Sequence, residues 1–199
     1  MTRPFILGLT GSIGMGKSTT AALFAAASIP VWDADAVVRQ LYDLGGAAVA
    51  PIAAQFPNAV KDGKVDRKAL KALLKDTPEA MVQLEAIVHP LTAQSRTEFV
   101  ASHLQEPLIV LDIPLLFETG ADKVCDAVLV VSAPAEIQKQ RVLSRGTMSE
   151  AEFELILSKQ MPDAEKRARA DYVIETLDVE TAARDVRRLI DQIMEKPHA

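Results

Sequence analysis

The amino-acid sequence predicts a three-layer α/β fold built on a parallel sheet. Short apolar runs recur along the chain without polar alternation, as is typical of strands covered on both faces. Helical patterns separate these runs, and strand–helix alternation with right-handed crossovers gives a parallel sheet. A glycine-rich turn follows the first run. The predicted strands are Phe5–Leu9, Ile29–Trp32, Leu108–Leu111, Ala127–Val131 and Tyr172–Ile174.

The helices between the strands are indicated by their end signals. The first is expected from Lys17 to about Ala27, directly after the glycine-rich turn. Thr77 is a suitable N-cap in front of Pro78, because proline fits the first position of a helix. Ser149 and Glu152 have the spacing of a capping box. The last helix starts at about Val179 and has one apolar face, formed by Ala182, Val186, Leu189, Ile190 and Ile193.

Two segments are too long for simple crossovers and predict additions to a single 199-residue domain. Asp35–His103 is mostly helical and suggests a separate lobe. Arg141–Arg169 is rich in Lys and Arg and suggests a mobile flap. The expected division is a core (about 1–34, 104–140 and 170–199), a helical lobe (about 35–103) and a flap (about 141–169).

The composition excludes several classes of protein. The formal charge is -5, from 22 basic and 27 acidic residues, which argues against a nucleic-acid partner. Cys125 is the only cysteine, so a disulfide within the chain is excluded and a reducing compartment is expected. No apolar run has membrane-spanning length and no leader pattern is seen. A cytoplasmic protein without a membrane association or an obligate protein partner is expected.

The glycine-rich turn has the spacing of a phosphate loop: Gly, four residues, Gly, Lys, Ser. A strand precedes it and a helix follows, which is the context that the pattern requires. Glycines allow backbone N–H groups to approach phosphate oxygens, and the helix adds its positive end. Lys17 is expected to reach the β- and γ-phosphates and Ser18 to bind Mg²⁺. The predicted residues of this ATP or GTP site are Gly11, Ser12, Ile13, Gly14, Met15, Gly16, Lys17, Ser18 and Thr19.

Other signals narrow the class of nucleotide protein. A GTPase needs an Asn-Lys-x-Asp stretch, but the only asparagine is Asn58, which is followed by Ala59. The Leu-Ser-Gly-Gly signature of transporter ATPases is also absent. A small-molecule kinase is therefore favoured, in which a closing flap excludes water.

Carboxylates stand at the ends of two predicted strands, where open α/β sheets bind ligands. Asp33 ends the second strand and is a candidate to accept a proton from an attacking hydroxyl or to position Mg²⁺ through water. Asp35, two residues later, is either a substrate-binding residue or the N-cap of the next helix. Asp112 ends the third strand and is a candidate Mg²⁺ ligand, with a strand-end cap as the alternative.

Over most of its length the chain resembles the dephospho-CoA kinases, with motifs in the family's order. The resemblance implies that ATP phosphorylates the ribose 3′-hydroxyl of dephospho-CoA. It also implies that the core binds the nucleotide, that the helical lobe binds the acceptor, and that the flap is a lid. Two alternatives remain: a kinase of another nucleoside, nucleotide or small alcohol, and a non-catalytic ATP-binding module. The motifs are Leu9–Thr19, Asp33-Ala34-Asp35, His89-Pro90, Asp112–Glu118, Arg141 with Arg145, Gln160-Met161-Pro162 and Ala170–Ile174.

The resemblance also implies roles for individual residues. Asp33 would orient or deprotonate the 3′-hydroxyl, and Lys17 would stabilise the transferring phosphoryl group. Arg141 and Arg145 would close over the phosphates, and their spacing puts them on one helix face; a solvated face is the alternative. Mg²⁺ and ATP are the implied cofactors.

Several assignments rest on the resemblance alone. His89 is an expected acceptor-site residue, or else a polar cap where a helix stops at Pro90. Leu115 and Phe117 are expected to line the acceptor pocket or to pack in the core. Glu118 is expected to be either a ligand or a helix cap.

Two positions differ from the family pattern. Met15 stands where a small residue is common, so its side chain must point away from the nucleotide. Glu175–Asp178 replaces the glycine or asparagine that often follows the last strand near adenine.

Overall fold

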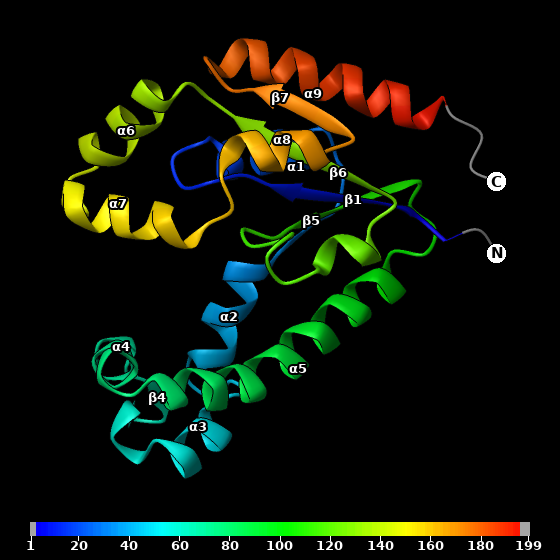
Figure 1. Cartoon of the computed structure of the whole chain (residues 1–199). Coiled ribbons are helices and arrows are strands. Elements are labelled where there is room, and N and C mark those ends of the chain that lie inside the picture. Colours follow the sequence, from blue (N-terminus) through cyan, green and yellow to red (C-terminus); the bar gives the residue numbers. More distant parts are fainter. Residues whose placement is uncertain (1–2, 196–199) are drawn as a thin grey trace. The chain divides into compact units, whose positions relative to one another are not determined.

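The computed structural model describes residues 3–195 and divides the chain into two compact units. One unit comprises Met1–Trp32 with His103–Ala199, and the other comprises Asp33–Ser102. Figure 1 shows the sheet and the helices around it. In the described part of the chain, no helix is long and apolar enough to cross a membrane.

The first unit is built on a five-stranded sheet with the order β2-β5-β1-β6-β7. The pairs β1–β5, β1–β6 and β6–β7 are parallel, with Leu9 opposite both Asp112 and Leu129. The carboxyl ends of β1 and β5 therefore meet at one edge, as expected of a ligand site. The strands are β1 (Phe5–Thr10), β2 (Val31–Asp33), β5 (Leu108–Asp112), β6 (Ala127–Ser132) and β7 (Tyr172–Glu175).

Helices cover this sheet and bury its apolar residues. The residues of β5 and β6 are all buried, and Phe24 of α1 and Ile193 of α9 have no exposed surface. The apolar face predicted for the last helix is confirmed, with Ile190 partly buried. These helices are α1 (Lys17–Ala26), α6 (Ala135–Ser144), α7 (Glu150–Lys159), α8 (Asp163–Arg169) and α9 (Val179–Met194), with a short η2 (Ala121–Val124).

The second unit is helical, with its own apolar core. Ile52, Leu70, Leu84 and Val88 are among its buried residues. Its elements are α2 (Ala34–Tyr42), α3 (Val49–Gln55), η1 (Pro57–Ala59), a hairpin of β3 (Val60–Lys61) and β4 (Lys64–Val65), α4 (Arg67–Asp76) and α5 (Pro78–Ser102).

The helix end at Pro90, which was the alternative reading of His89, is not present. α5 continues to Ser102 with Pro90 in its interior, although proline removes one helical hydrogen bond. The Thr92 hydroxyl donates to the carbonyls of Val88 (3.1 Å) and His89 (2.9 Å), in the turn around Pro90. Packing of the apolar face before Pro90 holds the helix, so the reading of His89 as a terminal cap is wrong.

Two further expectations have clear outcomes. The Ser149–Glu152 capping box is confirmed, with each residue bonded to the backbone of the other. The second strand begins at Val31 rather than Ile29. Pro30 lies just before the strand and has no N–H to donate to a neighbouring strand. Its carbonyl still accepts a hydrogen bond from Val110 N (2.9 Å).

Candidate functional site

The phosphate loop joins β1 to α1, and its glycines are required by both conformation and space. Gly14 and Gly16 have φ values of 80° and 86°, a region that favours glycine. A Cβ atom on Gly16 would lie 2.8 Å from Thr176 Oγ1, and one on Gly11 would lie 2.5 Å from Val131 Cγ2. The loop therefore packs tightly between the ends of β6 and β7.

Met15 anchors the loop to the core. Its side chain is 3% exposed, and its Sδ accepts a hydrogen bond from Ala133 N (3.0 Å). Its carbonyl accepts a hydrogen bond from Thr176 Oγ1 (2.8 Å). The Met15 side chain thus lies in the protein interior, and the expectation that it points away from the nucleotide stays a prediction.

Lys17 and Asp112, predicted from separate motifs, form an ion pair. Lys17 Nζ lies 2.6 Å from Asp112 Oδ1, and the Asp112 side chain is only 4% exposed. Lys17 is the first residue of α1, whose first amides have no partner within the helix. A half-buried cation, helix amides without a partner within α1, and a buried carboxylate thus gather where β1 and β5 end.

The oxygen donors near this pair suit a magnesium ion that arrives with a nucleotide. Among residues 3–195, no three His, Cys, Asp or Glu side chains are grouped to hold a metal ion. Mg²⁺ needs no such cage, because it keeps several waters and binds one or two protein oxygens plus phosphates. Ser18, exposed on the first turn of α1, and Asp112 provide donors of this kind.

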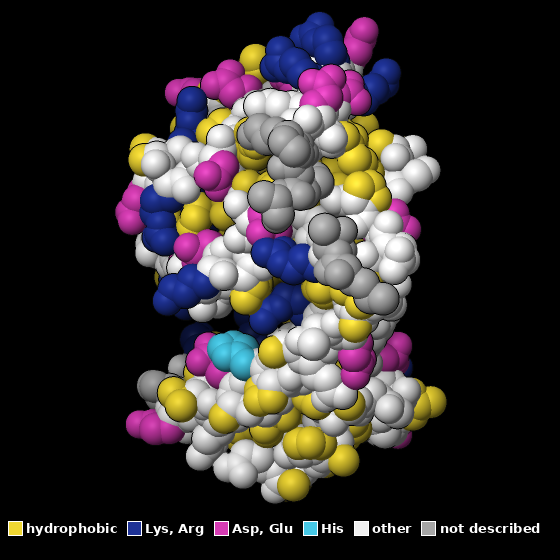
Figure 2. Space-filling model, turned by 90° about the vertical axis from the view of Figure 1, so that its right-hand side faces the viewer, with side chains coloured by type: hydrophobic (Ala, Val, Ile, Leu, Met, Phe, Trp, Pro, Cys, Tyr) yellow, Lys and Arg dark blue, Asp and Glu magenta, His cyan; other side chains and the backbone are white. Residues whose placement is uncertain are grey.

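Arg141 and Arg145 line one cavity beside the loop. The cavity has a volume of about 530 Å³, and its walls also include Gly16, Thr19 and Leu177. Two cations, a loop glycine and apolar side chains thus surround one space. On the face of the molecule seen in Figure 2, basic and acidic side chains are interspersed.

Thr176 forms hydrogen bonds with several of the elements around this cavity, and it was not among the predicted site residues. Its residue is 5% exposed, and its hydroxyl bonds the Met15 carbonyl and accepts from Arg141 Nη1 (3.1 Å). Arg141 Nη2 also donates to the carbonyls of Thr176 and Leu177. No local sequence signal identifies Thr176, because its partners come from segments distant in the chain.

An ion pair joins α8 to the segment that follows β5. Lys166 has no exposed surface, and its Nζ lies 2.9 Å from Glu118 Oε1. The Glu118 carboxylate also accepts from Met161 N (2.9 Å), and Ser132 Oγ donates to Asp163 (2.7 Å). Burial raises the pKa of Glu118, but the hydrogen bonds from Lys166 and Met161 outweigh it, so the pKa is lowered. Glu118 thus ties two segments together.

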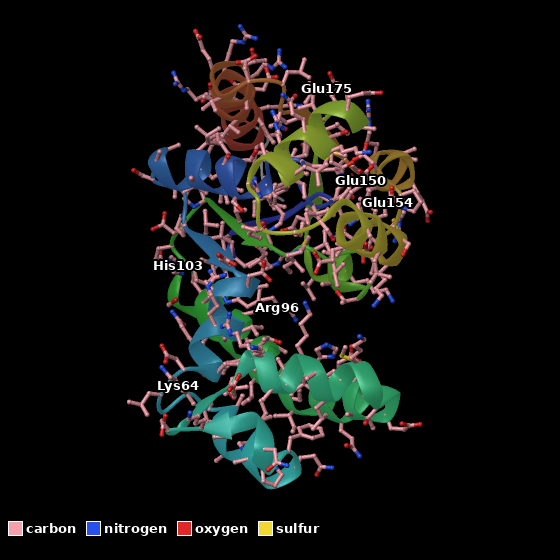
Figure 3. All side chains as sticks on the ribbon, turned by 90° about the vertical axis from the view of Figure 1, so that its left-hand side faces the viewer. Lys64, Arg96, His103, Glu150, Glu154 and Glu175 are labelled. Carbon is pink, nitrogen blue, oxygen red and sulfur yellow. The ribbon has the colours of Figure 1, made fainter. Side chains whose placement is uncertain are left out.

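α6 and α7 lie side by side in the first unit (Figure 1). Lys139 of α6 forms a salt bridge with Glu150 of α7, and Glu154 projects from the same helix (Figure 3). The hydrogen bond and charge of Glu150, with the charge of Glu154, raise the pKa of Lys139. This pairing connects the helix that carries Arg141 to the next helix.

Asp33, the first residue of the second unit, is the N-cap of α2. Its Oδ1 accepts a hydrogen bond from Ala36 N (2.9 Å), and its Oδ2 lies 3.4 Å from Arg39 Nη2. Asp35 lies in the first turn of α2, so the expectation that Asp35 is the N-cap is wrong. The extended backbone of Asp33 (φ -105°, ψ 110°) suits a cap.

The second unit contains a pocket of about 410 Å³ lined by both charged and apolar side chains. The Arg67 guanidinium lies 5.9 Å from the centre of the Tyr42 ring. Burial raises the pKa of Tyr42, and the charge of Arg67 opposes this rise only in part. The polar walls are Asp35, Arg39, Tyr42, Arg67 and Lys71, and the apolar walls are Val38, Leu70, Leu74 and Leu84.

The remaining predicted residues are not brought into either cavity wall. His89 is exposed on α5. Leu115 is 41% exposed, whereas Phe117 is 7% exposed with the Arg169 guanidinium 4.4 Å from its ring centre.

Comparison with known proteins identifies close relatives. The family model for dephospho-CoA kinase matches residues 5–181. A dephospho-CoA kinase of Cereibacter sphaeroides is 57% identical over 197 residues, which are 99% of this chain and 100% of that protein. These matches do not favour the two alternative functions.

Solved structures agree with the predicted fold class. TT1252 from Thermus thermophilus has a TM-score of 0.84 and 38% identity, over 96% of this chain and 98% of that one. Dephospho-CoA kinase from Campylobacter jejuni has a TM-score of 0.67 at 22% identity, over 94% of this chain and 96% of that one, which supports the fold alone. The three-layer α/β prediction is confirmed.

Proposed function

Because the chain belongs to the dephospho-CoA kinase family, which catalyses the last step of coenzyme A biosynthesis, we propose how its own residues perform this reaction. The ribose 3′-oxygen of dephospho-CoA forms a bond to the γ-phosphorus of ATP. The bond from that phosphorus to the β–γ bridging oxygen breaks, and ADP leaves. The observation that carries this proposal is the gathering of Lys17, Asp112, Arg141 and Arg145 around the phosphate loop.

ATP is bound by the phosphate loop and the cavity beside it. Loop residues 11–19 surround the phosphates with backbone amides, apart from those of Ile13 and Met15, which are bonded to Gln160 and Ser12. The positive end of α1 also favours the phosphates. Leu177 and Val179 provide apolar wall for the adenine ring, and the cavity volume of about 530 Å³ is within the range of small-molecule sites. The β7–α9 loop therefore receives the base in place of the glycine or asparagine that relatives often have.

Charge on the transferring group is balanced by cations of this chain. Lys17 exchanges its Asp112 partner for the β- and γ-phosphates, which frees the Asp112 carboxylate for a metal ion. Ser18 and Asp112 would hold Mg²⁺, which neutralises phosphate charge when bound. Arg141 and Arg145 bind phosphate oxygens with planar guanidinium groups, which suit bidentate contacts.

Asp33 accepts the proton of the 3′-hydroxyl. Its Oδ1 is used by the Ala36 amide, so Oδ2, beside Arg39, is the oxygen available to the hydroxyl. A positioned base of this kind contributes about 10²–10⁴-fold to a rate.

The acceptor's diphosphate and pantetheine arm occupy the pocket of the second unit. Arg39, Arg67 and Lys71 match the diphosphate charge, and the apolar side chains match the arm. Asp35 borders this pocket, and His89, Leu115 and Phe117 are further proposed acceptor contacts. A cytoplasmic location and the absence of a nucleic-acid partner are further proposals, supported by composition.

A substrate panel tests the proposed function. ADP release is measured with ATP, Mg²⁺ and either dephospho-CoA, adenosine or AMP. We expect kcat/KM for dephospho-CoA to exceed that for adenosine by at least about 100-fold, because adenosine cannot reach the cationic pocket. Equal values, or no ADP release with dephospho-CoA, would contradict the proposal.

A further inference from the structure

Both polar groups of the Ile13 backbone, at the crest of the phosphate loop, are bonded to glutamines from outside the loop. Ile13 N–H donates to Gln160 Oε1 (3.1 Å), and Gln138 Nε2 donates to the Ile13 carbonyl (2.7 Å). The two bonds lie on opposite sides of the Ile13 Cα, so they restrain both of its backbone rotations.

The helix that carries Gln138 also touches the next residue of the loop. A Cβ on Gly14 would lie 2.9 Å from the Gln138 carbonyl oxygen and 2.7 Å from Val142 Cγ2. The turn is closed from within by Met15 N, which donates to the Ser12 carbonyl (3.1 Å). α6 therefore packs tightly against Gly14, and its Gln138 side chain donates a hydrogen bond to the preceding loop residue, Ile13.

The two glutamines are themselves fixed. Gln138 is 5% exposed and precedes Arg141 by about one helical turn, so its bond to the loop also positions the part of α6 that carries Arg141. Gln160 directly precedes Met161, whose N–H is bonded to Glu118, the partner of buried Lys166. Neither glutamine is a mobile surface side chain that meets the loop by chance.

We propose that Gln138 and Gln160 are positioning residues that hold the phosphate loop in the conformation that binds the phosphates of ATP, an inference that deepens the proposed function and rests on it. A glycine-rich loop has many accessible conformations, and ordering it on binding weakens affinity. Bonds that order the loop beforehand remove this cost, so they strengthen nucleotide binding without touching the nucleotide.

Methionine substitutions separate positioning from packing. Q138M and Q160M keep an unbranched side chain of similar size and remove the strong hydrogen bonds. Q140M, at an exposed glutamine of the same helix, is the matched control. The dissociation constant of Mg·ADP is measured by calorimetry, melting by scanning calorimetry, and exchange of the Ile13 amide hydrogen by NMR.

The expected results differ among the variants. Each of Q138M and Q160M weakens Mg·ADP binding about 3- to 10-fold, the effect of one hydrogen bond. Ile13 amide exchange speeds up in Q160M and changes less in Q138M, because only Gln160 accepts from that N–H. Q140M leaves both quantities unchanged.

Unchanged Mg·ADP affinity in a folded Q160M whose Ile13 amide exchanges faster would overturn the inference, since the bond would then order nothing that the nucleotide needs. A lowered melting temperature with wild-type affinity would also overturn it. If Q138M does not fold, Q160M decides alone. Nucleotide binding requires no acceptor, so a wild-type protein that leaves dephospho-CoA unphosphorylated refutes the proposed function and not this inference.

Discussion

Replacement of Glu118 with Gln tests its ion pair with Lys166, which joins α8 to the segment that follows β5. The Lys166 side chain has no exposed surface, and its partner Glu118 is 19% exposed. Glutamine keeps the size of Glu118 and an acceptor for the Met161 amide, but it leaves the Lys166 charge uncompensated in the protein interior.

The expected loss is large for a single substitution. Removal of one partner of a buried ion pair costs about 3–5 kcal/mol, and the partial exposure of Glu118 favours the lower end. For a chain of this size, about 3 kcal/mol lowers Tm by roughly 6–12 °C. K166M removes the buried charge itself, so E118Q/K166M is expected to recover at least about 2 kcal/mol relative to E118Q.

Urea unfolding of the wild type, E118Q, K166M and the double variant at pH 7 measures these free energies. The double-mutant cycle isolates the interaction of the two side chains. An E118Q variant within about 0.5 kcal/mol of the wild type, or strictly additive effects, would refute the claim that this pair anchors α8.

Three further predictions follow from the geometry. The pKa of Glu118 is lowered, so its ionised form stabilises the protein fully above the ordinary value of about 4.5, and this contribution is lost as pH falls through the lower folded-state value. The unfolding free energy of E118Q should therefore fall less than that of the wild type between about pH 5 and pH 3. Parallel curves of unfolding free energy against pH for the two proteins would exclude this. D33N keeps an N-cap acceptor for Ala36 N and should retain Tm and ATP affinity, while kcat falls about 10²–10⁴-fold; an unchanged kcat would exclude Asp33 as the base. G16A places a Cβ 2.8 Å from Thr176 Oγ1 at a φ of 86°, so ATP affinity measured by calorimetry should fall at least about tenfold, against unchanged affinity if the loop adapts.

The strands and the phosphate loop were predictable because their signals are local. Apolar runs and glycine spacing identify β1 and the loop from a few adjacent residues, and the Ser149–Glu152 capping box needs only four. Pro90 shows the limit of local signals. Proline opposes a helix, but packing of Leu84 and Val88 in the second unit outweighs that preference.

Contacts between segments distant in sequence were not predictable. Thr176 meets Met15 across 161 positions, and Gln138 meets Ile13 across 125. A threonine after a strand or a glutamine on a helix has no spacing signature, and only the fold supplies its partner. Asp33 shows an intermediate case, because the sequence indicated both a cap and a functional carboxylate but assigned the cap to Asp35.

The structure of the phosphorylated product tests the central claim most directly. The purified protein is incubated with Mg·ATP and dephospho-CoA, and the product is examined by mass spectrometry and ³¹P NMR. The account predicts one added phosphoryl group, located on the ribose 3′-oxygen, with one ADP formed for each. A phosphoryl group at another position, or ADP formed without a phosphorylated acceptor, would contradict it.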